Sequence, residues 1–233
     1  MSPRPKLITA QGNLPQAILE TAWKQIAESG APTLSLRAIA RELNITAPAI
    51  YNYYSDRDAL VTALIVDAFT SLADSQNYIL DTIPPDKLEA RFSELGLAYR
   101  DWALEQEQRY QLIFGTPIPG YRAPEDITVP AAARALIPLM ITLQALYQAG
   151  QLRIERLPKL TPELKGMLEA WQAFVKQVGS DVHEEVLYLA YVVWGRVHGL
   201  VALEIGHQQP AFITDPGEVF RREIEAMKQQ YIN

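Results

Sequence analysis

The sequence predicts an all-α chain with a small N-terminal headpiece of three helices and a larger helical body. Signals for β-strands are scarce along the 233 residues, whereas apolar side chains recur at helical spacing between residues that cap helices. The stretch SLRAIARELNITAPAIYNYYSDRDAL, residues 35–60, also reads as two short helices joined by a tight turn. We place the boundary between the headpiece, residues 1–54, and the body, residues 55–233, after the second of these helices.

The first predicted helix begins at Asn13 or Thr9 and ends at Gly30. The second begins at Ser35, whose hydroxyl can accept a hydrogen bond from an amide of the first helical turn. Asn44 lies at the turn that follows, because asparagine tolerates the left-handed backbone conformation better than other non-glycine residues. The apolar stripe of the first helix consists of Ile18, Leu19, Ala22, Trp23 and Ile26.

The third predicted helix has Thr46 as its N-cap and Pro48 in its first turn, where the missing N–H costs no helical hydrogen bond. Ile50 is its inward anchor, and either Tyr53 or Tyr54 completes the inner face. Small residues at its outer N-terminal turn let the backbone approach a DNA groove, and tyrosine hydroxyls suit phosphate oxygens. The pattern therefore predicts a helix presented to DNA, although two short helices and a turn also arise by chance in helical proteins.

Residues from about 14 to 60 resemble the DNA-binding domain of the TetR family of transcriptional regulators. The matching pieces are Ser29-Gly30, SLRAIA, LNI, TAPAIYNYY and the sequence Arg57-Asp58-Ala59-Leu60. The resemblance implies that Tyr51 and Arg57 contact backbone phosphates and that the exposed third-helix residues lie toward the bases. The expected DNA-contacting set is Ser35, Arg37, Thr46, Ala47, Pro48, Ala49, Tyr51, Asn52, Tyr53 and Arg57.

The third helix carries no Lys or Arg, since none occurs between Arg41 and Arg57. A bidentate contact to guanine from its centre is therefore excluded. Base reading would depend on Asn52, on Thr46 and on apolar contact with thymine methyl groups.

Helix signals continue through the body. Ser55 and Asp58 resemble a capping box that opens a long helix toward Leu80. The proline pair at residues 84–85 ends that region, and the longest predicted loop is GTPIPGYRAPED, residues 115–126. Further helices are predicted over residues 86–114, 129–149, 162–178, 183–207 and 216–231.

Composition restricts the function classes. The chain has no cysteine, which excludes disulfides, thiolate metal sites and cysteine nucleophiles. No secretory signal and no uninterrupted apolar run of about 18 residues is visible, so we expect a cytoplasmic protein that does not enter the membrane. We expect no cofactor and no metal, because the three histidines and the acidic residues show no metal-ligand spacing.

The net charge of −6 is unevenly distributed. Residues 1–60 carry six basic and five acidic side chains, whereas the rest carries 15 basic and 22 acidic ones. Local charge determines the interaction with phosphates, so the total does not exclude DNA. Arg4 and Lys6 form a short basic arm that either adds phosphate contacts or is a disordered tail, and we favour the tail.

The segment YVVWGRVHGLVALEIGH, residues 191–207, is the most distinctive part of the body. Gly195 and Gly199 lie one helical turn apart, and each costs roughly 1 kcal/mol of helix propensity against alanine. Close helix–helix contact would compensate for that cost, across a two-fold axis or inside the monomer. We favour the dimer contact and expect it to involve Gly195, Gly199, Ala202, Gly206, Phe220, Ile224 and Met227.

The same segment resembles the C-terminal ligand-binding domain of a TetR branch marked by Trp, His and Gly at the spacing of Trp194, His198 and Gly199. The stretch RYQLIFGTPIPGY, residues 109–121, is similar to the same branch. The resemblance implies that the last two helices form a four-helix dimer interface and that a pocket between helices binds an effector. We expect His198 to be a packed, hydrogen-bonded side chain rather than a ligand or base.

Aromatic side chains of the body are the candidates for lining an effector pocket, which would favour a small lipophilic molecule. Aromatic residues at helical spacing are also typical of a solid core, and the sequence does not separate the two cases. The candidates are Phe69, Tyr99, Trp102, Tyr110, Phe114, Tyr147, Trp171, Phe174, Trp194 and His198.

The sequence therefore predicts a homodimeric, ligand-responsive repressor that binds double-stranded DNA at a palindromic operator. The alternative is a helical small-molecule-binding or interaction protein without sequence-specific DNA binding, which the uncharged third helix keeps open. An enzyme is the third choice, because no nucleophile–base pair or metal-ligand spacing is visible.

Overall fold

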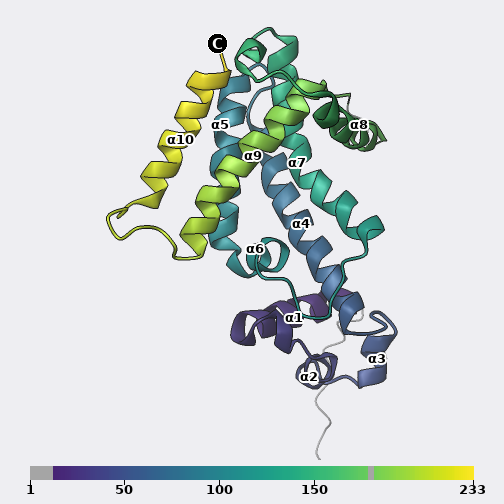
Figure 1. Ribbon diagram of the computed structural model, residues 1–233. Helices are drawn as coiled ribbons and strands as arrows, with labels where there is room; N and C mark the ends of the chain where they lie inside the picture. Colours follow the sequence, from purple (N-terminus) through teal and green to yellow (C-terminus); the bar gives the residue numbers. More distant parts are fainter. Residues whose placement is uncertain (1–12, 178–180) are drawn as a thin grey trace, which may run out of the picture. The chain divides into compact units, whose positions relative to one another are not determined.

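The computed structural model describes residues 13–177 and 181–233 (Figure 1). Arg4, Lys6, Thr9 and the predicted helix end at Val178 lie outside these residues. The described chain is nearly all helical, and its strand-like pairing is limited to an isolated bridge between Leu152 and Ile232. The prediction of an all-α fold is confirmed.

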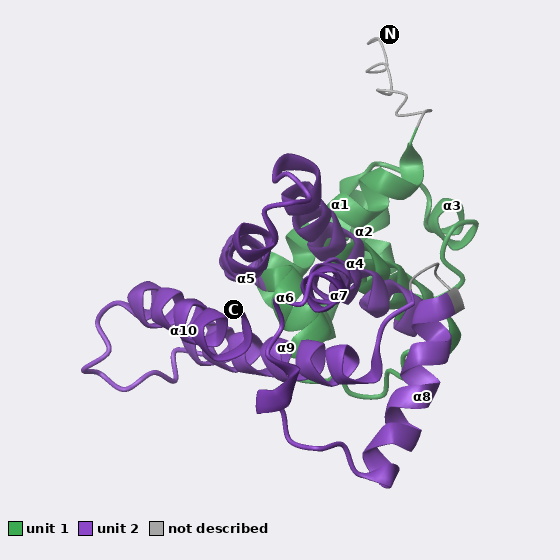
Figure 2. Cartoon of the chain, turned by 90° about the horizontal axis from the view of Figure 1, so that it is seen from above, with its two compact units in different colours: residues 1–68, 108–128 green, residues 69–107, 129–233 purple. Residues whose placement is uncertain are grey.

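The chain divides into two compact units that interleave along the sequence (Figure 2). The first contains residues 1–68 and 108–128, and the second contains residues 69–107 and 129–233. The headpiece expected over residues 1–54 belongs to the first unit, which also includes residues 55–68 and a segment far along the chain. The functional boundary at residue 54 stays a prediction.

The first unit is built around three short helices: α1 (Leu14–Ser29), α2 (Leu36–Glu42) and α3 (Ala47–Tyr51). Asn13 is the N-cap residue of α1, and Gly30 ends the helix with a positive φ of 81°, which only glycine adopts readily. The first unit also contains the start of α4 (Arg57–Thr82), α6 (Glu107–Phe114) and the loop after it. Its fully buried side chains include Ile18, Ile39, Ile50, Leu60 and Leu64.

The second unit contains α5 (Leu88–Glu105), α8 (Pro162–Gln177), α9 (Glu184–Ile205) and α10 (Pro216–Tyr231), together with most of α7 (Glu125–Gln148). In it, α10 packs against both α5 and α9, and α8 packs against α9. By length and composition alone, α7 and α9 are long and apolar enough to cross a membrane. Core helices of soluble proteins often have the same length and composition. The fully buried side chains of this unit include Phe92, Met140, Leu143, Leu187 and Phe220.

The cap of α4 differs from the predicted Ser55–Asp58 capping box. The helix begins at Arg57, and the amide of Ala59 donates to Asp56 Oδ1 over 2.8 Å. Asp56 is therefore the residue whose side chain satisfies an amide of the first turn, because its carboxylate reaches the third helical position. The Ser55 hydroxyl instead hydrogen-bonds to Asp56 Oδ2.

The helix predicted over residues 86–114 is two helices. It breaks at Gln106, whose φ of −118° and ψ of 45° are not helical, so that α5 ends at Glu105 and α6 begins at Glu107. No glycine or proline marks the break in the sequence. The two helices belong to different units, and tertiary packing of α6 within the first unit overrides the local helical preference.

Candidate functional sites

The α2–turn–α3 motif has the predicted local geometry. Ser35 Oγ accepts a hydrogen bond from the amide of Ala38 over 3.3 Å, which caps α2. Asn44 has a φ of 54°, in the left-handed region that the turn requires. Pro48 lies in the first turn of α3, and Ile50 is fully buried beneath it.

The outer face of α3 exposes Tyr51 and Asn52, with 45% of Tyr51 accessible. Thr46 is the N-cap residue, but its side chain makes no capping hydrogen bond. Tyr53 is 50% exposed and Tyr54 is half-buried, so Tyr54 is the tyrosine that completes the inner face. Of the remaining predicted contacts, Arg37 and Pro48 are exposed and Ser35, Ala47 and Ala49 are half-buried.

Arg57 is held by its own headpiece. Its guanidinium donates to the backbone carbonyls of Ala31 and Pro32, each over 3.2 Å, and lies 3.7 Å from the carboxylate of Asp58. About a third of the side chain, 31%, remains accessible. The residue that the sequence assigns to phosphate binding therefore also ties the turn after α1 to the start of α4.

The cations left for DNA on the described headpiece are few. Lys24 forms an ion pair with Glu42 over 2.6 Å, which raises its pKa chiefly through that hydrogen bond. Within residues 13–60, Arg37 and Arg41 are exposed and make no ion pair. Arg37, Arg41 and the accessible part of Arg57 are therefore the cationic groups of this part of the chain that remain open to solvent.

A polar cluster that the sequence did not reveal joins three helices of the first unit. Asp67 Oδ2 on α4 accepts hydrogen bonds from the indole N–H of Trp23 over 2.7 Å and from the guanidinium of Arg109 over 3.0 Å. The Arg109 guanidinium also lies 4.8 Å from the centre of the Trp23 ring, a cation–π distance. The three residues come from α1, α4 and α6, up to 86 positions apart, and no local pattern could have paired them.

A second contact attaches the loop after α6 to the same unit. The hydroxyl groups of Thr62 and Tyr121 lie 2.8 Å apart, in hydrogen-bond contact. Burial raises the pKa of Tyr110 on α6 to about 12, so its hydroxyl stays neutral well beyond physiological pH. Residues 108–128 are thus held to the rest of the first unit at two separate places, through Arg109 and through Tyr121.

The ten aromatic and histidine candidates for an effector pocket fall into several groups. In the first unit the rings of Tyr110 and Phe114 pack at 5.2 Å. In the second unit the Trp102 indole donates to Ser71 Oγ over 3.0 Å, and Tyr147 stacks on His183. Phe69, Trp171 and Phe174 are half-buried on α4 and α8.

His198 lies at the centre of the remaining group. Its imidazole stacks on Trp194 at 5.0 Å, and its Nδ1 lies 2.8 Å from the hydroxyl of Tyr99 on α5. Burial lowers the pKa of His198 and so favours the neutral imidazole. His198 is therefore packed and hydrogen-bonded, as expected, and that it serves neither as a ligand nor as a base stays a prediction. Which of the ten residues line a cavity stays a prediction.

The small-residue face of α9 is open where the sequence predicted a helix contact. A Cβ placed on Gly195 or Gly199 would meet no atom within 4 Å, so neither glycine is packed inside the monomer. Exposed Tyr191 and Leu203 lie one turn beyond the glycines on the same stripe. Ala202 beside this stripe is half-buried.

Four of the residues predicted at a dimer interface have other roles or places. Gly206 is the C-cap of α9, with its amide bonded to the carbonyl of Ala202, and therefore ends the stripe. Phe220, Ile224 and Met227 are at most 4% exposed and belong to the core side of α10. They are therefore unavailable to a second copy as the chain stands, because the amphipathic helix turns its large apolar residues toward α5 and α9.

The outer side of α10 faces a groove that it shares with α9. The groove has a volume of about 680 Å³ and is lined by Arg196 and Leu200 of α9 and by five residues of α10: Glu218, Val219, Arg222, Glu223 and Ala226. Val219 is 37% exposed there, while Arg196 is paired with Glu223. The α9–α10 face therefore combines exposed apolar atoms with charges that are already paired.

No group of three or more potential metal ligands occurs within residues 13–177 and 181–233.

Two family models match the chain. One, described as "Bacterial regulatory proteins, tetR family", matches residues 18–64 and so covers α2 and α3. The other, described as "Tetracyclin repressor-like, C-terminal domain", matches residues 92–227.

The chain is also similar to individual proteins and to solved structures. The HTH-type transcriptional regulator Rv1816 of Mycobacterium tuberculosis is 32% identical over 91% of this chain and 89% of its own. The crystal structure of the regulatory protein SCO4313 has a TM-score of 0.68 at 32% identity, covering 91% of this chain and 93% of that one. A protein of unknown function from Rhodococcus sp. RHA1 shares the fold, with a TM-score of 0.72 at 20% identity over 97% of this chain and 99% of that one.

Proposed function

Because the chain belongs to the TetR family of helix-turn-helix transcriptional regulators, which is not an enzyme family, we propose that it represses genes by binding a palindromic operator as a homodimer and is released by a small lipophilic effector. The observation that carries the proposal is the exposed face of α3, where Tyr51 and Asn52 extend from a helix anchored by buried Ile50. This role places the protein in the cytoplasm with the DNA.

For DNA contact we propose the ten residues predicted from the sequence, with their roles divided by exposure. Tyr51, Tyr53 and Arg37 are accessible and carry hydroxyl or guanidinium groups suited to phosphate. Asn52 can pair with adenine, and Thr46 and Pro48 offer small polar and apolar contacts to base edges. Few cationic contacts predict a shallow dependence of affinity on salt.

Dimerisation supplies a second headpiece, since one headpiece with so few contacts should bind weakly. We propose that the α9–α10 face forms the interface, through Gly195, Gly199 and Ala202 of α9 and through Val219 and Ala226 of α10. Two α3 helices would then enter successive major grooves, about 34–36 Å apart on one side of the duplex. The open space over both glycines supports this assignment.

We propose that the chain belongs to the TetR branch marked by Trp194, His198 and Gly199, and that the effector binds beside this group of residues. The stacked Trp194–His198 pair, with the Tyr99 hydroxyl on His198, offers an aromatic surface with one polar edge. A mostly apolar ligand with a single hydrogen-bonding group would suit it. Effector binding would favour a conformation with lower DNA affinity, and the coupling between the two sites is reciprocal.

Selection of bound sequences from random duplex DNA tests the operator. We expect an enriched motif of two inverted half-sites spaced by about one helical turn. Retention of DNA without an enriched motif would favour the alternative, a helical binding protein that lacks sequence-specific DNA recognition.

The Tyr51 hydroxyl gives a finer test on the selected site. We expect Tyr51→Phe to lower affinity several-fold and Tyr51→Ala to lower it further, because a phosphate contact is lost. Tyr78→Phe is the matched control, since Tyr78 is 65% exposed but lies on α4 in the second unit. Equal affinities for all three variants and the wild type would remove Tyr51 from the interface.

A further inference from the structure

The loop between α9 and α10, residues 206–215, carries a large apolar side chain in water. Phe212 is 80% exposed, the highest value among the large apolar side chains that the structure describes. The exposed part of a phenylalanine ring gains no free energy from burial within its own chain. A single exposed residue is common, so the surroundings of the loop decide its meaning.

Both ends of the loop are fixed by hydrogen bonds. At the first end, the Arg100 guanidinium binds Glu204 in the last turn of α9 through two contacts of 2.8 and 2.5 Å, and both side chains are less than a fifth exposed. At the second end, Asp215 caps α10 by accepting from the amide of Glu218 over 2.9 Å. Between them, the amide of Ile213 donates to the carbonyl of Pro210 across a turn.

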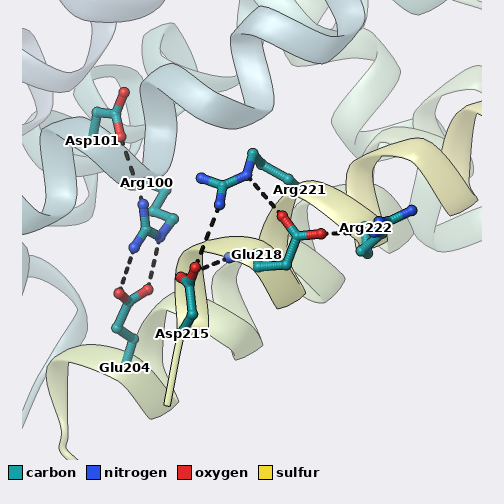
Figure 3. Close-up of polar contacts among 7 residues, drawn as sticks. All are labelled: Arg100, Asp101, Glu204, Asp215, Glu218, Arg221 and Arg222. Carbon is teal, nitrogen blue, oxygen red and sulfur yellow. Dashed lines mark hydrogen bonds and ion pairs between the residues drawn. The ribbon is translucent and has the colours of Figure 1, made fainter. Parts of the chain in front are cut away.

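Arg100 of α5 binds Glu204 at the first end of the loop (Figure 3) and also lies close to the first turns of α10. Its guanidinium carbon lies 5.9 Å from the centre of the Phe220 ring on α10, and a Cβ on Gly217 would come within 3.2 Å of its terminal nitrogen. One partly buried cation therefore contacts both the end of α9 and the start of α10. Because both ends are fixed, the loop loses less conformational entropy when a partner binds.

Two further exposed apolar side chains flank the loop in the sequence. Leu203 in the last turn of α9 is 41% exposed, and Val219 in the first turn of α10 is 37% exposed. Both residues flank the loop in the chain, and Val219 also lines the α9–α10 groove. The loop thus extends the surface that we assign to dimerisation.

Resting on the proposed homodimer, we propose that the α9–α10 loop docks on a second copy of this chain and that Phe212 is its anchor. A two-fold interface places the same patch on both subunits, so a patch of one charge sign would repel itself. Here the charges beside the loop balance: Asp215 and Glu218 are paired with Arg221 and Arg222 (Figure 3). This balance suits self-association and gives no attraction for DNA phosphate.

The first test measures self-association by sedimentation equilibrium. We expect Phe212→Ala to weaken the dimer by about tenfold or more, since aromatic anchors dominate interface energies. Met167→Ala on α8 is the matched control, because Met167 is 71% exposed, and its effect should stay below about twofold. Circular dichroism should show unchanged helix content and thermal unfolding of both variants at a concentration where each is monomeric.

The second test exploits the absence of cysteine from the chain. A thiol introduced by Ala211→Cys keeps Phe212 in place, and Ala170→Cys on α8 is its control, since both alanines are exposed. The reaction rate of the thiol at residue 211 should fall as protein concentration passes through the dimer dissociation constant. The rate at residue 170 should stay constant.

The outcomes separate the two proposals. A wild-type dimer that is unaffected by Phe212→Ala, with equal labelling of both thiols, overturns the docking of the loop and leaves the homodimer intact. A wild-type chain that stays monomeric at the highest concentrations overturns both. In the dimer, Arg100→Met should also weaken association, and Arg100→Lys should restore part of it by keeping one contact to Glu204.

Discussion

At the scale of one residue, the structural contacts of Arg57 and its proposed phosphate contact would share one side chain. A guanidinium has five N–H donors, and here one of its nitrogens serves the carbonyls of Ala31 and Pro32. The accessible third of the side chain leaves other donors for phosphate. Lysine would keep the charge but lose the planar guanidinium whose terminal nitrogen reaches both carbonyls.

We therefore expect Arg57→Lys and Arg57→Ala to differ in two measurements. Both should lower the free energy of unfolding by about 1–2 kcal/mol in urea titrations, because two hydrogen bonds from a charged donor are lost. Only Arg57→Ala should reduce the slope of log affinity against log salt, by about one unit for one phosphate contact. An unchanged salt slope for Arg57→Ala would limit Arg57 to its structural role.

His198 predicts a dependence of stability on acid. Burial lowers its pKa in the folded chain below the value of about 6.5 that it has when unfolded. Below that pH the unfolded chain binds more protons, so the free energy of unfolding decreases as pH falls from about 7 to 5. In urea titrations across this range, His198→Gln should lose less stability than the wild type. His207→Asn, which alters an exposed histidine, should follow the wild-type curve, and parallel curves for all three proteins would contradict the prediction.

At the scale of elements, the start of α4 depends on one cap. Asp56→Ala removes the acceptor for the Ala59 amide and should lower the free energy of unfolding by about 0.5–2 kcal/mol. Ser55→Ala removes a hydroxyl that contacts Asp56 rather than the backbone, so its effect should be much smaller. Chemical denaturation of the two variants measures both losses of unfolding free energy. A larger loss for Ser55→Ala than for Asp56→Ala would favour the capping box that the sequence predicted.

The packing of α10 on α5 depends on the absence of a side chain at Gly96. A Cβ there would overlap Cδ1 of Ile224, which is buried. We expect Gly96→Ala to destabilise the wild type although alanine favours helix, and Ile224→Val to relieve the overlap by deleting Cδ1. In a double-mutant cycle by urea denaturation, Gly96→Ala should be more favourable in the Ile224→Val background by about 1 kcal/mol. Additive effects would show that the core accommodates the extra carbon without this contact.

Residues that cap helices or favour turns made most helix boundaries predictable from the sequence. Gly30 and Asn44 have the positive φ that their turns require, and Pro48 lies in the first turn of α3. Ser35 caps α2 through its side chain, as the sequence indicated. The break at Gln106 was not predictable, because tertiary contacts of α6 cause it. The buried side of α10 was missed because periodicity shows that one face is apolar but not which neighbour covers it. Phe220 and Ile224 were therefore assigned to a second copy when α5 and α9 already cover them.

At the scale of the whole molecule, the first unit depends on contacts between distant parts of the sequence. Asp67 joins Trp23 to Arg109, and Thr62 joins α4 to Tyr121. Asp67→Asn keeps an acceptor for the indole but removes the ion pair, so residues 108–124 should exchange amide hydrogens faster than in the wild type. Asp74→Asn, at an exposed carboxylate further along α4, should leave that exchange unchanged. Hydrogen-exchange mass spectrometry checks both, and unchanged protection in Asp67→Asn would show that Thr62 and apolar packing suffice.

The discontinuity of the first unit determines how its DNA specificity can be transplanted. A chimaera that exchanges only residues 1–54 would pair a foreign α1 with the native Asp67 and Arg109 and would lose the Trp23 contacts unless the donor also had tryptophan there. An exchange of residues 1–68 together with 108–128 carries every partner of this cluster along. Designers who graft new DNA recognition onto the second unit of this chain should therefore move two segments of chain.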